Sequence, residues 1–540
     1  MSFSKRLCVG VLLLFSVCLS SADDSEFSQK LAALTTTKLS EMSAAVEDVA
    51  NTGKEQALPY LDALLNNQLY FRKSDSKLFR IDTSKDPAIM TEVAVDKKLE
   101  GADTSDFKKI IISNSVRTKL REVMARLQLA SSDTKLRARA AREMLGAVTE
   151  SDKPILEEAL SKEKNDEVIA LLKAAIALPQ LDSGTAAQRL AALDNLEGNV
   201  EPAVRNRLNQ LLEKNADGTF IETDVAVRSR ASVVMGTIES KLQRYRLLET
   251  IFFGISLGSV LLLAAIGLAI TFGVMGVINM AHGELIMLGA YTTYVIQQWL
   301  PNQLELSLLL AVPAAFVVAG LVGIAIERGV IRWLYGRALE TLLATFGISL
   351  VLQQAVRTIF SPLNRQVATP DWMSGSWQIN SVFSLTLNRL YIVVFSLIVF
   401  ALLSLLLKKT SLGLYVRAVS QNRAMAKAMG VRSDWVDALT FGLGSGIAGM
   451  AGVALSQLTN VGPNMGQAYI IDSFMVVVFG GVGNLWGTLV GSLALGVANK
   501  FLEPASGAVL AKIFVLIFII LFIQKRPRGL FPQKGRSAES

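Results

Sequence analysis

Long runs without any charged residue dominate the chain after residue 250. Lys, Arg, Asp and Glu are all absent from residues 250–283, 285–304, 306–326, 341–356, 390–407, 438–471, 473–499 and 513–524. Such runs cross a bilayer or re-enter it as broken helices, since a spanning helix needs about 20 apolar residues. Only 19% of the residues are charged, against about 25% in soluble domains. A fully soluble protein is therefore excluded. The sequence predicts an all-α, polytopic transmembrane helical bundle of about eight spans, some of them broken or re-entrant.

The first 22 residues have the features of a signal peptide. Lys5 and Arg6 precede an apolar stretch that is followed by Ser-Ser-Ala at 20–22. That stretch of about 13 residues is too short for a stable membrane anchor, which is the alternative interpretation. We therefore expect the mature chain to begin near Asp23. Both cysteines, Cys8 and Cys18, lie in this segment, so disulfides, thiol catalysis and cysteine-ligated metals are excluded from the mature protein.

Residues 23–223 carry most of the charge and are predicted to form an exported, mostly helical domain. Two alternating segments at 69–73 and 77–81 flank a short polar turn, which predicts a small β-hairpin. From 114 to 214 the apolar residues follow a helical period. The residues that show this spacing are Val116, Leu120, Val123 and Leu127, and then Leu136, Ala140, Met144 and Ala147.

The later helical segments of this domain repeat a similar Ala/Leu/Arg composition. This pattern favours either a short HEAT-like solenoid or an ordinary helical bundle, and the sequence leaves both open. The segment contains no His and no Cys, and its acids alternate with bases as on a solvated helix face. No catalytic site is expected here.

The remaining chain divides into a linker helix at 224–249, a transmembrane domain at 250–530 and a tail at 531–540. Basic residues gather after one span at 328–337, in the loop at 408–432 and in the tail. Since positively charged loops stay in the cytoplasm, these three regions are predicted to be cytoplasmic. An exported amino-terminal domain agrees with that orientation.

The loop from 410 to 432 has more structure than an orientation signal requires. It is rich in Ala and Met, contains four basic residues and ends its helical pattern at Gly430. A glycine in this place typically closes a helix. We therefore predict a compact cytoplasmic helix pair that docks in a groove on a partner. The alternative is that the loop only sets the orientation of the protein.

Several segments together resemble the branched-chain amino-acid type of ABC permease. These are GLAITFGVMGVINMAHGELIMLGAY at 267–291, the loop at 410–431, FGGVGNLWGTLVG at 479–491 and RPRGLFP at 526–532. The resemblance covers about residues 250–535. The long exported extension resembles the urea-transport branch of that family, which implies urea or short amides as the substrate. The loop has Asn422-Arg423-Ala424 where other ABC importers carry Glu-Ala-Ala.

The resemblance also implies the partners and the location of the protein. It implies a second homologous permease subunit, two cytoplasmic ATP-binding-cassette ATPases and a periplasmic solute-binding protein, assembled at a bacterial inner membrane. The chain has no Gly-x-x-x-x-Gly-Lys-[Ser/Thr] motif, so we expect that it does not hydrolyse ATP itself. We also expect no cofactor and no nucleic-acid partner. A branched-chain amino-acid permease and a passive urea channel remain the alternatives. A membrane-anchored sensor is disfavoured, because so many spans exceed what an anchor needs.

Candidate site residues fall into two groups. Polar residues inside the spans suit a neutral, hydrogen-bonding solute, although such residues more often hold helices together. The predicted pathway residues are Asn279, His282, Glu284, Thr345, Gln353, Asn460 and Asn484. The residues predicted to couple to the ATPase are Ser411, Gly413, Arg417, Asn422, Arg423, Ala424, Gly430 and Arg432.

His282 is the only histidine, and it stands two residues before Glu284. A metal site would need three or four ligands, so we expect none here. Asn279 is a candidate cap for the helix that carries both residues. The pair is either a buried clamp at a helix break or part of a gate, since ionisable groups at membrane depth are usually functional. Asp472 is a second acid within the spans, with Lys500 or Lys512 as its candidate partner.

Overall fold

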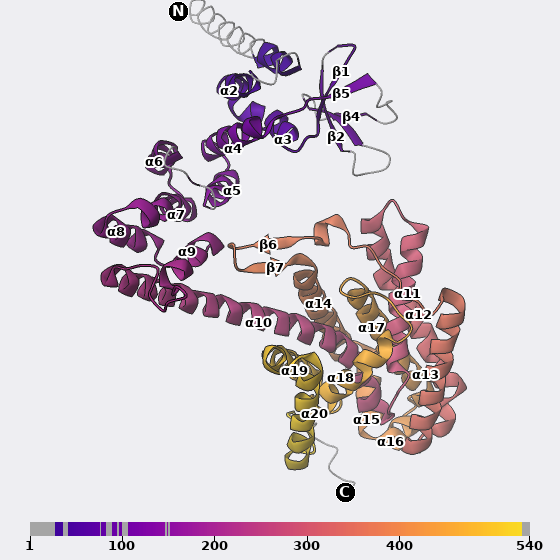
Figure 1. Cartoon of the computed structure of the whole chain (residues 1–540). Coiled ribbons are helices and arrows are strands. Elements are labelled where there is room, and N and C mark those ends of the chain that lie inside the picture. Colours follow the sequence, from indigo (N-terminus) through magenta and orange to yellow (C-terminus); the bar gives the residue numbers. More distant parts are fainter. Residues whose placement is uncertain are drawn as a thin grey trace, which may run out of the picture. The chain divides into compact units, whose positions relative to one another are not determined.

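A computed structural model of the chain describes residues 27–35, 41–75, 77–82, 89–93, 97–99, 106–145, 148 and 152–531. The chain forms two compact units, Met1–Leu242 and Gln243–Ser540. The predicted signal peptide at 1–22 and nearly all of the predicted tail at 531–540 lie outside the described residues. Figure 1 shows the elements of each unit.

The first unit begins with helices and a small sheet. The helices are α2 (Met42–Gly53), η1 (Lys54–Ala57) and α3 (Leu58–Leu65). The strands are β1 (Leu69–Arg72), β2 (Leu78–Asp82), β3 (Ile89–Glu92), β4 (Lys97–Leu99) and β5 (Phe107–Lys109). The predicted hairpin is confirmed, with Tyr70 opposite Phe79 in the β1–β2 pair. It belongs, however, to a five-stranded antiparallel sheet in the order β4-β3-β2-β1-β5. The three additional strands are short and largely polar, so their sequences lack an alternating pattern.

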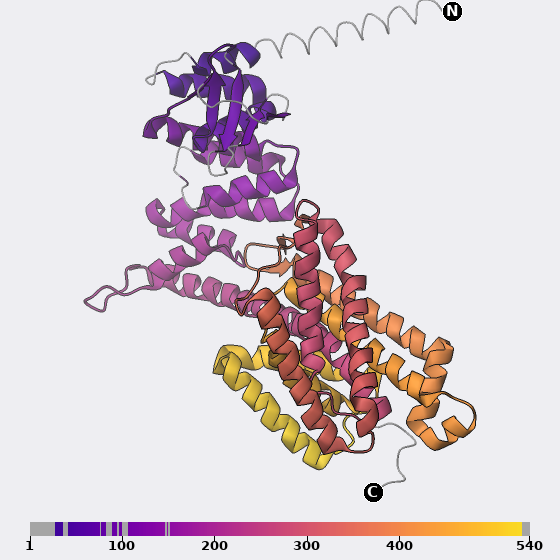
Figure 2. The ribbon, with the colours of Figure 1, turned by 90° about the vertical axis from the view of Figure 1, so that its right-hand side faces the viewer.

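Six helices follow in the region predicted to be helical. They are α4 (Asn114–Leu129), α5 (Thr134–Met144), α6 (Lys153–Lys162), α7 (Asp166–Ser183), α8 (Ala186–Leu196) and α9 (Pro202–Leu212). Figure 2 shows them stacked beneath the sheet. Helix α7 contacts α5, α6, α8 and α9, and α5 also contacts α4. Whether these contacts amount to a HEAT-like repeat stays a prediction.

The predicted apolar faces of these helices are only partly correct. In α4, Val116, Leu120 and Val123 are buried as expected. In α5, Ala140 is buried as expected, but Leu136 is exposed, and the helix also buries Ala138 and Ala141. Alanine dominates this helix, so several faces fit a helical period equally well, and its neighbours select one of them.

A single helix, α10 (Val225–Met275), is 51 residues long and contains nearly all of the predicted linker and the first charge-free run as far as residue 275. The Asp224 carboxylate accepts the backbone N–H groups of Ala226 (2.8 Å) and Val227 (3.2 Å) at its start. These bonds satisfy two of the free donors that every helix start exposes. The helix therefore runs without a break from the predicted linker into the first span.

The second unit is a helical bundle. Its further helices are α11 (His282–Trp299), α12 (Leu304–Gly329), η4 (Ile331–Leu334), α13 (Ala338–Phe360), η5 (Asp371–Met373), α14 (Leu387–Lys409), α15 (Ser411–Gln421), α16 (Arg423–Ala428), α17 (Ser433–Ser456), α18 (Met465–Gly480), α19 (Leu485–Ser506) and α20 (Ala508–Lys525). Strands β6 (Ser376–Gln378) and β7 (Ser384–Thr386) form a second hairpin between α13 and α14.

Within the described chain, seven helices are long and apolar enough to cross a membrane, against about eight predicted. They are α10, α12, α13, α14, α17, α19 and α20. Helix α18 is shorter but apolar. Helix α11 begins with polar residues, directly after the non-helical segment that separates it from α10. An exported amino-terminal domain and a cytoplasmic carboxyl-terminal tail require an odd number of membrane crossings. Eight membrane-spanning helices therefore do not fit that orientation. The predicted architecture of a polytopic helical bundle is confirmed.

Helix α17 lies at the centre of the bundle, packed against α11 and α12. Small residues allow this close packing. A Cβ atom on Gly289 of α11 would overlap the backbone of Gly449 in α17, so the two helix backbones touch at this point. The core around them contains Tyr291, which is 2% exposed, and Phe441.

Candidate functional site

The chain is unwound between α10 and α11, inside the bundle. Gly276 adopts a left-handed conformation (φ +68°) just after α10 ends. The Met280 N–H donates to the hydroxyl of Thr345 in α13 (3.1 Å), and the Ala281 N–H donates to the side chain of Asn279 (3.0 Å). Unwound backbone at membrane depth has to find partners within the protein. Thr345 and Asn279 supply such partners here.

Asn279 was a candidate cap for α11, but it does not cap that helix. The residue at the N-cap position is Ala281, whose side chain has no polar atom, and Asn279 binds its N–H from two positions upstream. Asn279 therefore stabilises the turn that leads into the helix. Its side-chain nitrogen is buried and has no hydrogen-bond partner among the described residues.

His282 is completely buried at the first position of α11. Its Nε2 lies 2.8 Å from the carbonyl oxygen of Ala264, in the last quarter of α10. A carbonyl oxygen only accepts, so Nε2 carries the proton in this contact. His282 thus ties the start of α11 to α10 across the unwound segment. The other ring nitrogen, Nδ1, is buried and finds no partner within the described chain.

Glu284 is also buried, at 1% exposure. Its Oε1 accepts hydrogen bonds from the Ser349 hydroxyl (3.0 Å) and the Gln353 amide (2.7 Å), both on α13. Its second oxygen, Oε2, has no partner in the described part of the chain. We call Asn279, His282, Glu284, Thr345, Ser349 and Gln353 the helix-break cluster.

Ser349 was missed by the sequence analysis, although a signal for it exists. Polar residues recur at every fourth position of α13, which places them along one face of that helix. They are Thr341, Thr345, Ser349, Gln353 and Arg357. The last of these, Arg357, donates to Asn464 just before α18 (2.7 Å). A search for a polar stripe at a period of four would have found the whole set.

Two predicted pathway residues lie away from this cluster. Asn460 is exposed in the segment between α17 and α18. Asn484 caps α19, where its oxygen accepts the N–H groups of Trp486 (3.0 Å) and Gly487 (3.2 Å). Its amide nitrogen donates to the carbonyl of Phe531 (3.2 Å). The structure therefore brings together five of the seven residues predicted for the pathway.

Asp472 pairs with Lys512 rather than Lys500. The Lys512 ammonium lies 2.9 Å from the Asp472 carboxylate and joins α20 to α18. Lys500 instead pairs with Glu503 on its own helix (2.6 Å). The sequence had left these two lysines as equal candidates.

The predicted helix pair is present as α15 and α16. Thr410 caps α15 by accepting the Gly413 N–H (3.4 Å), and Asn422 caps α16 by accepting the Met425 N–H (2.9 Å). At the end of α16, Gly430 has φ +88° and its N–H donates to the Lys427 carbonyl (3.1 Å). The next N–H, of Val431, donates back to Ala426 (3.0 Å). These two bonds form a Schellman motif, which requires the left-handed residue that glycine provides.

The residues of this pair point in different directions. Gly413 is buried, because a Cβ atom there would overlap the backbone of Leu407, and Arg417 donates to the Leu407 carbonyl. Ser411, Asn422, Ala424, Gly430 and Arg432 are exposed. So are the apolar side chains of Leu414, Tyr415, Met425 and Met429, which we call the apolar docking face.

Arg423 is bound within the chain. Its guanidinium pairs with Asp437, whose side chain is fully buried near the start of α17, and stacks 4.4 Å from the ring of Tyr335. Burial raises the pKa of the Tyr335 phenol, which therefore stays neutral beside this pair. Arg423, which was predicted to couple to the ATPase, thus connects the helix pair to α17.

The comparisons with known proteins place residues 250–523 in one family. The matching family model is described as the branched-chain amino acid transport system / permease component. The high-affinity branched-chain amino acid transport system permease protein BraD of Pseudomonas aeruginosa is 31% identical over 297 residues, which is 53% of this chain and 96% of BraD. LivH of Salmonella typhimurium, with the same function in its name, is 31% identical over 293 residues, or 52% of this chain and 94% of LivH.

A more distant similarity involves sugar importers. The ribose import permease protein RbsC of Escherichia coli is 31% identical over 113 residues, which is 20% of this chain and 35% of RbsC. No solved structure matches the chain. The family match begins at residue 250, so the first unit lies outside it.

Proposed function

The chain belongs to the family of branched-chain amino-acid transport permease components, and from that premise we propose that it carries a branched-chain amino acid across the bacterial inner membrane. The observation that supports this substrate class is the pair of relatives named for it, each of which the chain covers almost completely. The chain is a multi-pass permease subunit of an ABC importer, and such importers work with ATPase and solute-binding subunits.

We propose that the helix pair α15–α16 docks the ATPase through its apolar docking face. Leu414, Met425 and Met429 are 57%, 61% and 78% exposed, and apolar side chains outside the lipid are stabilised when a partner covers them. A movement of the docked pair would reach the spans through Arg423 and Asp437, because this ion pair joins α16 to the central helix α17. Two ATPases and a second homologous permease subunit would complete the membrane assembly.

The helix-break cluster is our candidate for the translocation route. His282, Glu284 and Asn279 each keep a buried polar atom without a partner among the described residues. Such atoms are costly unless another state of the protein, or a passing solute, satisfies them. We expect His282→Ala to impair uptake while the protein still assembles in the membrane. Loss of the folded protein would favour a purely structural clamp, and full uptake would exclude both roles.

Urea is a second candidate substrate. The matched relatives align only with the second half of this chain, so the 249 residues before the match distinguish it from those amino-acid permeases. An additional exported domain of this kind resembles the urea-transport branch. Urea is a neutral, hydrogen-bonding solute, and the polar side chains of α13 are of the type that suits it.

Uptake measurements separate these substrates. In a strain deleted for the chain, plasmid-borne protein should restore uptake of labelled leucine, and unlabelled valine should compete. Restored uptake of urea that leucine does not inhibit would replace the first proposal with the second. Transport of either solute at the same rate without any ATPase would support a passive channel.

A glycine pair tests the docking role. Gly430→Val forces a branched side chain into a left-handed conformation at the end of α16 (φ +88°). Gly375→Val imposes the same strain near the β6–β7 hairpin (φ +87°), and neither glycine has an atom within 4 Å of an added Cβ. We expect only Gly430→Val to lose co-purification of the ATPase and ATP-dependent uptake. If it binds the ATPase and transports normally, the docking assignment is wrong.

A further inference from the structure

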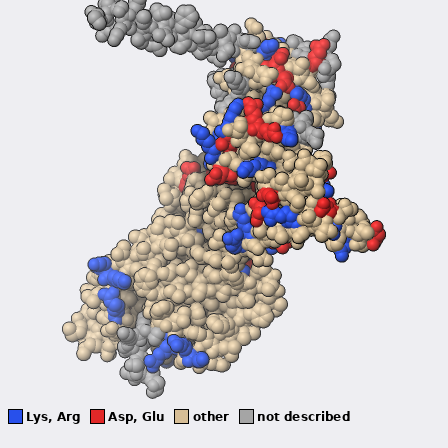
Figure 3. All heavy atoms as spheres, turned by 90° about the vertical axis from the view of Figure 1, so that its left-hand side faces the viewer, with Lys and Arg blue, Asp and Glu red and all other residues tan. Residues whose placement is uncertain are grey.

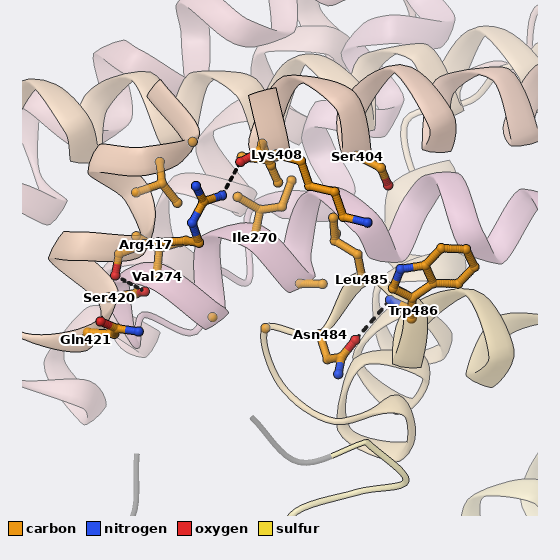
Figure 4. A pocket seen from close by; sticks show the side chains of 16 residues that line it. Ile270, Val274, Ser404, Lys408, Arg417, Ser420, Gln421, Asn484, Leu485 and Trp486 are labelled. Atoms are coloured by element: carbon orange, nitrogen blue, oxygen red, sulfur yellow. Dashed lines mark hydrogen bonds between the residues drawn. The ribbon is translucent and has the colours of Figure 1, made fainter. Parts of the chain in front are cut away.

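A cavity of about 540 Å³ lies beside the helix pair, and none of the four residues of the apolar docking face lines it. It is enclosed by the end of α10, the last turns of α14, one face of α15 and the start of α19 (Figure 4). Its size is within the range of small-ligand pockets, about 300–1,000 Å³. The residues that supply its polar atoms are Ser404, Lys408, Arg417, Ser420, Gln421, Asn484 and Trp486.

The cavity is positively charged. Lys408 and Arg417 line it, and none of its 16 lining residues is acidic. Neither cation forms an ion pair with a carboxylate within the described part of the chain. Arg417 donates one N–H to the Leu407 carbonyl, which leaves further guanidinium donors for a ligand. Two cations without counter-charges in one pocket favour an anion.

The walls place this positive charge at the end of the apolar spans. Lys408 stands in the last turn of α14, and Trp486 stands in the first turn of α19 with its ring 5.9 Å from the Lys408 ammonium. Lysine and tryptophan at helix ends are typical of the boundary between lipid and water. The Ser404 hydroxyl oxygen is buried there and has no partner among the described residues.

Two exposed leucines of α14 precede Lys408 at spacings of three residues. Leu402 is 60% and Leu405 56% exposed, and neither lines the cavity itself. A soluble anion would make no use of these two side chains, whereas acyl chains would cover them. We propose that the cavity binds the phosphate group of an anionic phospholipid, held by Arg417 and Lys408 with the acyl chains along Leu402 and Leu405. Basic pockets between spans on the cytoplasmic side suit such headgroups.

This site does not include the apolar docking face, although Gly413 and Arg417, which line it, were also predicted to couple to the ATPase. Leu414, Tyr415, Met425 and Met429 do not line the cavity. On α15, the cavity residues Gly413, Arg417 and Ser420 share one helix face by their spacing. Lipid binding is therefore independent of the proposed function and is measurable on the purified chain alone.

Fluorescence quenching reports directly on this cavity, because Trp486 forms part of its wall. The full-length protein is placed in bilayers of neutral phosphatidylcholine with increasing amounts of brominated phosphatidylglycerol or, separately, brominated phosphatidylcholine. The difference between the wild type and Trp486→Phe isolates the signal of Trp486. We expect the brominated anionic lipid to quench that signal at a lower mole fraction than the brominated neutral lipid.

Charge variants then test the assignment. Lys408→Gln and Arg417→Gln should each weaken the preference for the anionic lipid about fivefold. Arg417→Lys should retain most of it, because the charge remains although the bond to Leu407 changes. Lys409→Gln is the matched control, since it removes the neighbouring charge, which does not line the cavity. If Arg417→Gln fails to fold, Lys408→Gln decides the test.

Three results would overturn the proposal. The first is equal quenching of Trp486 by the two brominated lipids. The second is a loss of preference in Lys409→Gln as large as that in Lys408→Gln. The third is displacement by millimolar inorganic phosphate without any preference among lipids, which would assign the site to a soluble phosphate group.

Discussion

The two units of this chain build helices for different surroundings, and they stabilise them in different ways. In the first unit, side chains cap the starts of four helices: Ser113 for α4, Asp133 for α5, Asn165 for α7 and Thr185 for α8. Three other described helices of this unit, α3, α6 and α9, have no side-chain cap and carry a proline in the first turn instead. In the second unit, no side-chain cap is found at the described starts of α11, α12, α13, α14, α17, α18 or α20. The second unit has such caps only at α15, α16 and α19.

The two units also differ in the charged side chains at their surfaces. Acidic and basic side chains intermingle over the first unit, whereas uncharged residues cover most of the visible second unit (Figure 3). In water, capping and ion pairing satisfy helix ends and charged side chains at the surface. In lipid, helices associate through close backbone packing and a few buried hydrogen bonds. We therefore expect glycine contacts to dominate the stability of the second unit, and ion pairs and caps to contribute more to that of the first.

The largest loss of stability is expected from a substitution at the contact between α11 and α17. Gly289→Val would place methyl groups inside the backbone of Gly449, so the helices would have to separate. We expect loss of the folded protein from the membrane, measured by size-exclusion chromatography of a fluorescent fusion. Gly347→Val on α13 is the control, because a Cβ there meets no atom within 4 Å. Equal recovery of both variants would show that backbone contact does not dominate.

The next effect is expected at an ion pair of the first unit. Arg137 binds Glu163 (2.6 Å), whose side chain is 4% exposed, and the Arg137 side-chain hydrogen bonds lower the pKa of Glu163 to about 2. Arg137→Ala should lower the local free energy of unfolding by about 2 kcal/mol at pH 7. Hydrogen exchange of α5 and α7 in the full-length protein measures this change. Arg139→Ala, which removes an exposed pair with Glu143, should change it by less than about 0.5 kcal/mol.

The same pair predicts a pH dependence. A carboxyl group with a depressed folded-state pKa contributes stability above its unfolded value and loses it as the pH falls through the folded value. The wild type should therefore lose this contribution between about pH 4.5 and pH 2, and Arg137→Ala should lose much less over that range. Parallel pH profiles for the two proteins would contradict the assignment.

A smaller effect is expected at the helix break. Thr345→Val keeps the shape of the side chain but removes the oxygen that accepts the Met280 N–H. An unsatisfied buried donor should lower the stability of the second unit by about 1.5 kcal/mol, seen as a lower melting temperature in detergent. Thr292→Val is the control, because that hydroxyl donates only to the Leu288 carbonyl of its own helix. A larger loss in the control would exclude Thr345 as the support of the unwound segment.

The smallest effect is expected at a helix cap. Asp133 accepts the Lys135 N–H at the start of α5 (2.9 Å), so Asp133→Ala should destabilise that helix by about 1 kcal/mol. Gln303→Ala, at the uncapped start of α12, should have no measurable effect. Hydrogen exchange of the first turn of each helix compares the two. Equal effects of the two substitutions would contradict the conclusion that helix caps contribute more to the stability of the first unit than to that of the second.

Much of this architecture was predictable because it depends on local patterns. The charge-free runs located the spans, and the small-residue loop before Gly430 located the helix pair α15–α16. The hairpin at 69–81 was found for the same reason, since its strands alternate and its turn is polar. The other three strands were missed because they are too short to show a pattern. On α5, Leu136 was wrongly assigned to the buried face because alanine permits several faces.

The amino-acid sequence by itself determined where the chain is compatible with lipid, which segments are helical and which family the second half resembles. These properties depend on composition and on spacings within a few turns. Only the tertiary structure decided that Glu284 binds Ser349 and Gln353, that Asp472 pairs with Lys512, and that Arg423 turns inward to Asp437. Each of these choices depends on distances between elements that are separate in the chain. Within the bundle, the packing of helix backbones sets those distances, and no local pattern contains them.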